Sequence, residues 1–162
     1  MSEIHVLVVD DEKEIADLVE IYLVSDGYKV YKASNALEGL EILEKETIHL
    51  VLLDIMMPDA DGFTVLKYMA ENHYIEDVPV IAVTDEESPG ALRRAYEMGV
   101  SDFIARPFDA KVVYRRVSNT INLHEKQRRL ISAVLDEMLE KEKNSHILVD
   151  ILSQVTEFRS GM

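Results

Sequence analysis

The stretch VLLDIMMPDADG, residues 51–62, decides how the rest of the chain is interpreted. An apolar run ends in one carboxylate, Asp54, and a turn with Pro58 and Gly62 then leads into the helical pattern FTVLKYM. Open α/β sheets bind ligands at the carboxyl ends of their strands, where this acid would lie. A strand-ending acid can also cap a turn, so this stretch alone does not choose between a binding site and a turn.

A second apolar run strengthens the interpretation as a site. Residues 4–9, IHVLVV, are followed at once by Asp10, Asp11 and Glu12. Parallel strands present their carboxyl ends at the same edge of a sheet, so two neighbouring strands would bring these acids next to Asp54. The sequence therefore predicts a crevice lined by several carboxylates.

The order of apolar runs and helical patterns predicts an α/β fold. The runs with strand character are 4–9, 28–33, 50–53, 78–84 and 100–105. Segments with apolar residues at helical spacing lie between them, with short connections. This alternation indicates a parallel sheet covered by helices on both faces. We expect a flavodoxin-like (βα)5 doubly wound sheet of order 2-1-3-4-5, in which strands one and three meet at the switch point.

The last third of the chain predicts a long helical extension. Residues 108–160 contain neither glycine nor proline, and this is more chain than the last helix of a compact domain needs. We expect a domain at 1–124 and a helical extension at 125–162, with a break near Asn144. An apolar stripe with heptad spacing suggests self-association as a coiled coil, although packing of the helix on its own domain is the alternative.

Composition limits the class of partner. The net charge is −14, nearly all of it within residues 1–124, and such an acidic domain repels phosphate backbones and attracts divalent cations. The absence of cysteine excludes disulfides and fits a reducing cytoplasm. No apolar run approaches the length of a membrane span. We therefore expect a cytoplasmic protein with neither nucleic-acid nor membrane partners.

The predicted carboxylate crevice has a defined chemistry. Clustered carboxylates need a cation or a raised pKa at neutral pH, and Mg²⁺ is a hard cation that takes oxygen ligands and bridges to phosphate. A carboxylate can itself attack a phosphoryl group. The fourth and fifth strands end in the Thr84 hydroxyl and the Arg106 cation, which suit the charge that develops in phosphoryl transfer.

Together these motifs resemble the response-regulator receiver domains of two-component signalling, which are CheY-like. The resemblance covers residues 1 to about 124. It rests on the following residues, in this order: Asp10-Asp11, the run DIMMPDADG that begins at Asp54, Thr84, and Phe103-x-x-Arg106-Pro107.

The resemblance implies a role for each matching residue. Asp54 would be the phosphoacceptor, and a sensor histidine kinase would be the donor. Thr84 would hydrogen-bond the phosphoryl group, and Phe103 would change rotamer with it as the switch. The implied Mg²⁺ ligands are Asp10 (mostly through water), Asp11, Asp54 and the backbone carbonyl of Met56.

Two positions depart from the family pattern. Receivers usually carry lysine where this chain has Arg106, and a planar guanidinium is not equivalent to an ammonium. Arg106 is expected either to bind phosphate or to fill the pocket and pair with Asp54. The residue after Thr84 is usually small, whereas Asp85 adds a negative charge and offers Arg106 another partner.

Three functions remain open. The first is a phosphorylated receiver, without substrate turnover of its own, that relays its state through the C-terminal helix. The second is a pseudo-receiver that acts only as a dimerisation or interaction module. The third is a phosphohydrolase of the haloacid-dehalogenase kind, which would need an acid where this chain has Met56.

The resemblance also bears on partners and on the tail. Many receivers form homodimers through helix 4, strand 5 and helix 5, where this chain has Arg93, Arg94, Asp102, Arg115 and Arg116 for cross-subunit ion pairs. Solvated charges are the alternative. The ending ILSQVTEFRSGM resembles the lead-in to an HD-type phosphohydrolase output domain, although no His-Asp pair occurs here.

Overall fold

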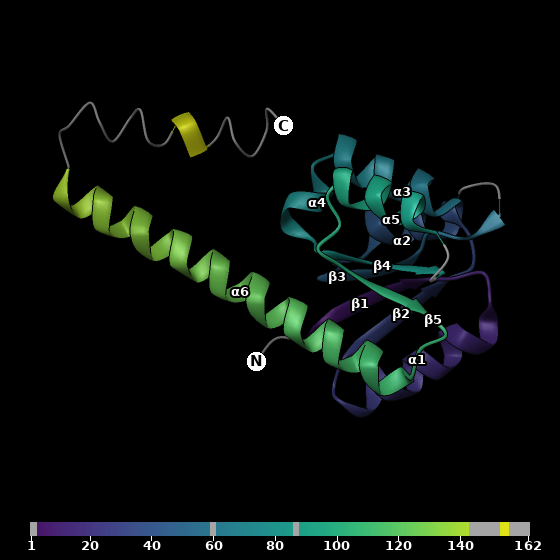
Figure 1. Ribbon diagram of the computed structural model, residues 1–162. Coiled ribbons are helices and arrows are strands. Elements are labelled where there is room, and N and C mark those ends of the chain that lie inside the picture. The colour runs from purple at the N-terminus through teal and green to yellow at the C-terminus, as the bar shows by residue number, and fades with distance from the viewer. Residues whose placement is uncertain (1–2, 59–60, 86–87, 143–152, 156–162) are drawn as a thin grey trace. The chain divides into compact units, whose positions relative to one another are not determined.

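The structure, a computed structural model, describes residues 3–58, 61–85, 88–142 and 153–155 (Figure 1). Five strands form one sheet in the order β2-β1-β3-β4-β5, and every neighbouring pair is parallel. The predicted fold class and strand order are confirmed. The strands are β1 (His5–Val9), β2 (Lys29–Ala33), β3 (Leu50–Asp54), β4 (Val80–Asp85) and β5 (Asp102–Arg106).

Helices connect the strands, as the spacing of apolar residues predicts. One addition is a short helix, α4, which follows the left-handed residue His73 (φ 61°). The fifth strand lies further along the chain than expected, because it begins at Asp102 rather than at residue 100 and ends at Arg106. The helices are α1 (Lys13–Ser25), α2 (Ala36–Lys45), α3 (Asp61–Glu71), α4 (Tyr74–Asp77), α5 (Pro89–Glu97) and α6 (Ala110–Lys141).

Helices cover both faces of the sheet (Figure 1), and a hydrophobic core lies on each face. Successive residues of β1 point to opposite faces of the sheet, so Leu7 and Val9 belong to one core and Val6 and Val8 to the other. The first core is closed by α2, α3 and α5, and the second by α1 and the start of α6. These four residues of β1 are each at most 2% exposed. The central strands are thus fixed on both faces, which gives the acids at their ends a rigid base.

The chain divides into two compact units, 1–121 and 122–162. In the second unit, α6 continues as helix to Lys141 and carries several exposed apolar side chains, namely Leu123, Leu130, Ile131, Val134 and Leu139. The predicted helix break near Asn144 lies outside the described residues, as does the ending ILSQVTEFRSGM apart from residues 153–155. None of the helices in the described ranges combines the length and the apolar character needed to cross a membrane.

Candidate functional site

Three carboxylates meet at the carboxyl ends of β1 and β3. Val9 and Leu53 are register partners, so the residues that follow them, Asp10 and Asp54, lie side by side. One carboxylate oxygen from each of Asp10, Asp11 and Asp54 lies within 4.8 Å of the others. Asp54 is 1% exposed and Asp10 5%, whereas Asp11 is exposed to solvent. The structure therefore brings together the three acids that the sequence singles out.

Backbone groups fix the orientation of the two buried carboxylates. The backbone N–H of Met56 donates to Asp54 Oδ1 at 2.8 Å, and the N–H of Glu12 donates to Asp10 Oδ1 at 2.9 Å. Helix α3 begins close against β3, because a Cβ at Gly62 would lie 2.4 Å from the carbonyl oxygen of Asp54. Only glycine fits at this position without a shift of backbone.

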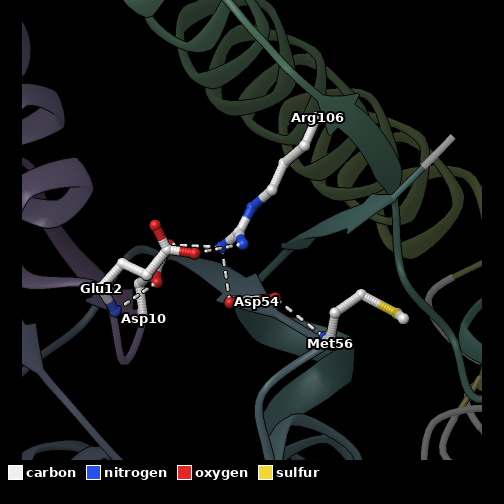
Figure 2. Close-up of polar contacts among 5 residues, drawn as sticks. All are labelled: Asp10, Glu12, Asp54, Met56 and Arg106. Carbon is white, nitrogen blue, oxygen red and sulfur yellow. Dashed lines mark hydrogen bonds and ion pairs between the residues drawn. The ribbon is translucent and has the colours of Figure 1, made fainter.

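Arg106, the last residue of β5, reaches across the site and contacts three acids (Figure 2). Its Nη2 lies 2.6 Å from Asp54 Oδ2 and 3.0 Å from Asp10 Oδ2, and its Nη1 lies 2.9 Å from Glu12 Oε1. The expectation that Arg106 pairs with Asp54 is thus met in this structure. We call the guanidinium and these three carboxylates the Arg106 clamp.

Asp85 is not part of the clamp. It is the register partner of Arg106 in the β4–β5 pair, but its side chain is exposed. Among the described residues, the ion pairs of Arg106 are those with Asp10, Glu12 and Asp54. The suggested Asp85–Arg106 pair is therefore wrong for this structure, because the guanidinium is turned to the denser group of carboxylates.

Burial controls the charge state of the site. It raises the pKa of Asp54 to about 6, although the Met56 N–H and the Arg106 guanidinium both act to lower it. The pKa of Asp10 is raised as well, again mainly by burial. Burial acts to lower the pKa of Arg106, but the surrounding carboxylates outweigh it and raise that pKa. Asp54 is thus mostly ionised at neutral pH and poised close to its titration.

The donor set suits a hard cation. Three carboxylates and one nearby guanidinium leave the site with an excess of negative charge, and every side-chain atom of the cluster that can ligate is an oxygen. Mg²⁺ prefers such ligands. The acidic cluster of Asp10, Asp11 and Asp54 therefore fits the metal site that the sequence predicts.

Thr84 lies on β4, the neighbour of β3, and Phe103 lies on β5, one strand further from the cluster. Thr84 is 2% exposed, and its hydroxyl donates to the backbone carbonyl of Asp85 at 3.4 Å. No described hydrogen bond joins Thr84 to the carboxylates. Phe103 is half-buried, and its ring meets that of Tyr96 edge to face, with ring centres 6.2 Å apart.

Some of the charged residues of α5, β5 and α6 have partners within the chain. Both Asp102 carboxylate oxygens accept from Arg116 Nη1 at 3.0 Å. The guanidinium carbon of Arg94 lies 4.1 Å from the centre of the Phe63 ring, a cation–π contact between α5 and α3. Three of the residues suggested for cross-subunit pairs, Arg94, Asp102 and Arg116, thus make contacts inside one molecule.

Two contributors, Glu12 and Gly62, were noted in the sequence but were given no role at the site. Glu12 follows the two aspartates as the third acid of a triplet, but its contact with Arg106 depends on where the sheet places the end of β5, with β3 and β4 lying between it and β1. Gly62 stood out only as a turn residue. A triplet of acids at a strand end is the one signal that could have pointed to Glu12.

Comparison with known proteins identifies the family. The response regulator receiver domain family matches residues 6–118. The regulatory protein VanR of Enterococcus faecium is 34% identical over 144 residues, which cover 89% of this chain and 57% of VanR. VanRc of Enterococcus gallinarum is 32% identical over 142 residues, which cover 88% of this chain and 60% of VanRc. The chain spans less than two thirds of the length of either relative.

Solved structures agree with this assignment. A CheY-like response regulator receiver domain protein from Methanospirillum hungatei superposes with a TM-score of 0.71 at 28% identity, over 78% of this chain and 99% of that one. NtrX from Brucella abortus gives a TM-score of 0.75 at 26% identity, over 82% of this chain and 30% of NtrX. The chain therefore belongs to the response regulator receiver domain family.

Proposed function

We propose that this chain receives a phosphoryl group on Asp54 from a histidine kinase in the cytoplasm and relays that state as a two-component signal. The observation that carries the proposal is the burial of Asp54 at a strand end, with Asp10, Asp11 and the guanidinium of Arg106 around it. The chain acts as a phosphoacceptor and has no substrate of its own to turn over.

The transfer is a displacement at phosphorus. An ionised oxygen of Asp54 attacks the phosphorus of a phosphohistidine, the phosphorus–nitrogen bond breaks, and the imidazole leaves with the electron pair. Asp54 is suited to this role because a pKa of about 6 leaves the carboxylate mostly ionised at neutral pH. Attack by Oδ2 requires Arg106 to move away from that oxygen, which it contacts at 2.6 Å.

Other residues of the chain stabilise the transferred group. Asp10, Asp11, Asp54 and the backbone carbonyl of Met56 would hold Mg²⁺, which neutralises phosphoryl oxygens when it is bound. The guanidinium of Arg106 can make two parallel hydrogen bonds to the same group. The buried hydroxyl of Thr84 would exchange its backbone contact for a phosphoryl oxygen, and Phe103 would change rotamer with it.

The signal would leave the domain through α5, β5 and α6. The half-buried ring of Phe103 meets the exposed ring of Tyr96 and thereby connects β5 to α5. Helix α6 extends from the second core through a stretch with five large exposed apolar side chains, which suits association with a second copy of the chain. We propose a homodimer that uses this helix, the α5–β5–α6 face, or both.

A second candidate is a pseudo-receiver that keeps the fold and dimerises without phosphorylation. The Arg106 clamp favours it, because a guanidinium covers Asp54 Oδ2 where receivers usually carry lysine. In that case, the helical extension alone would carry the function.

The test is the intact mass of the protein after incubation with Mg²⁺ and acetyl phosphate. We expect a single phosphoryl adduct that is absent from Asp54→Ala and absent when the metal is chelated. A protein that binds Mg²⁺ but gives no adduct, with acetyl phosphate or with a phosphorylated histidine kinase, would contradict the proposal and favour the pseudo-receiver.

A further inference from the structure

The Arg106 clamp engages two of the carboxylates that would hold a metal, Asp10 and Asp54. Asp54 Oδ1 accepts from Met56 and Asp54 Oδ2 from Arg106, while Asp10 Oδ1 accepts from Glu12 and Asp10 Oδ2 from Arg106. Each of the two buried carboxylates, Asp10 and Asp54, therefore accepts a hydrogen bond at both of its oxygens. Nη2 of Arg106 bridges the two, so the guanidinium itself supplies the positive charge that they share.

We propose that Arg106 and a divalent cation exclude each other at Asp54 and Asp10, and that Glu12 is the positioning residue that holds the guanidinium over the site. In the metal-free protein the clamp keeps the nucleophile covered. Arg106 would leave Asp54 and Asp10 when these carboxylates hold a divalent cation, and Asp54 would then be uncovered. This inference deepens the proposed function and rests on it for its biological meaning.

The shape of the guanidinium explains why this device needs arginine. Its planar fork contacts three carboxylates at once through two nitrogens, whereas the ammonium of lysine is a compact point charge. The Nε atom of Arg106 is buried and makes no hydrogen bond, so the two Nη nitrogens alone anchor the head group. Charge-assisted contacts of this kind are lost when the guanidinium leaves.

Glu12 can anchor the fork without belonging to the metal site. Its side chain is 54% exposed, and it lies outside the cluster formed by Asp10, Asp11 and Asp54. Glu12 is also the residue that precedes α1, but its side chain makes no capping hydrogen bond there. A Glu12→Gln substitution therefore weakens the clamp and leaves the helix start unchanged.

The experiment measures Mg²⁺ affinity by calorimetry, without any phosphoryl donor. We expect Arg106→Lys, which preserves the charge, to bind Mg²⁺ about tenfold more tightly than wild type. Long-range repulsion between like charges predicts equal affinities instead, because lysine carries the same charge. The matched control is Arg129→Lys, since Arg129 is exposed and pairs with Glu125 one helical turn away.

Glu12 gives a test in which the two explanations differ in sign. If Glu12 only attracts cations, Glu12→Gln weakens Mg²⁺ binding. If it positions Arg106, we expect binding to become at least about threefold tighter, and the same substitution in the Arg106→Lys background to weaken it. Unchanged or weaker binding by the single variant would overturn the role of Glu12.

A second readout follows Arg106 directly. In the metal-free protein the clamp should slow rotation of the guanidinium and give separate nitrogen-15 signals for its two Nη groups. Saturation with Mg²⁺ should merge or shift them. Signals that do not respond to Mg²⁺, or equal affinities for wild type and Arg106→Lys, would overturn mutual exclusion.

These results are separable from the proposed function. Tighter Mg²⁺ binding by Arg106→Lys in a protein that never forms a phosphoryl adduct would support the clamp and contradict the receiver function. An adduct together with equal affinities would do the reverse. Failure of every variant to bind Mg²⁺ would overturn both.

Discussion

The raised pKa of Asp54 predicts that acidification stabilises the folded protein through this residue. The side chain is 1% exposed, and burial raises its pKa from 3.8 to about 6. Above about pH 6 Asp54 is ionised in the folded state, where burial makes the charge less favourable than it is in the unfolded state. As the pH falls towards 3.8, only the folded state takes up the proton, and the penalty is relieved.

The magnitude follows from the size of the shift. One pKa unit corresponds to about 1.4 kcal/mol, so the complete effect is about 3 kcal/mol, of which about 2 kcal/mol is released between about pH 7.5 and about pH 4.5. Other groups titrate in this range, and some act in the opposite direction. Burial also raises the pKa of Asp10, whereas Ser34 hydrogen bonds lower the pKa of the exposed Glu38.

The variant Asp54→Asn isolates the contribution of Asp54. Asparagine preserves the shape and an acceptor for the Met56 N–H but does not titrate. The free energy of unfolding is measured by urea denaturation without Mg²⁺. As the pH falls from about 7.5 to about 4.5, we expect that of wild type to rise by about 2 kcal/mol relative to that of the variant. A relative fall would refute the reasoning, because it would mean that the Arg106 ion pair, rather than burial, sets the pKa.

Two further substitutions test contacts that hold the site in place. Gly62→Ala should destabilise the fold by more than about 2 kcal/mol, because its Cβ would lie 2.4 Å from the Asp54 carbonyl oxygen. The control is Gly90→Ala, which has open space around it and should not destabilise the fold. Both variants are measured by urea denaturation. Arg94→Met keeps an unbranched side chain of similar length but removes the charge above the Phe63 ring, so it should cost about 0.5–1 kcal/mol in the same assay, and an unchanged stability would show that the cation–π contact contributes nothing.

The clamp distinguishes this chain from a receiver in which lysine faces the phosphoacceptor. A fork that engages Asp54, Asp10 and Glu12 at once gives the metal-free site its own internal cation. The cost of taking these charges out of water offsets much of their attraction, so the clamp contributes more to the state of the site than to net stability. Metal availability would then decide how often Asp54 is uncovered.

The alternation of apolar runs and helical spacing was enough to predict the sheet, its order and the edge at which the acids gather. Periodicity records which face of each element is buried, and parallel connectivity then places the strand ends together. The long helix was also foreseeable, because residues 108–160 lack glycine and proline. The strands and the long helix could be predicted because each depends mainly on residues that are close together in the sequence.

The tertiary structure alone decided how Arg106 is used. The sequence allowed it to bind phosphate, to pair with Asp54 or to pair with Asp85, and local pattern carries no information on the choice. The residues that it contacts, Asp54, Asp10 and Glu12, lie 52, 96 and 94 positions away. Their distances, and the burial that raises the pKa of Asp54, exist only once β1, β3 and β5 are packed into one sheet.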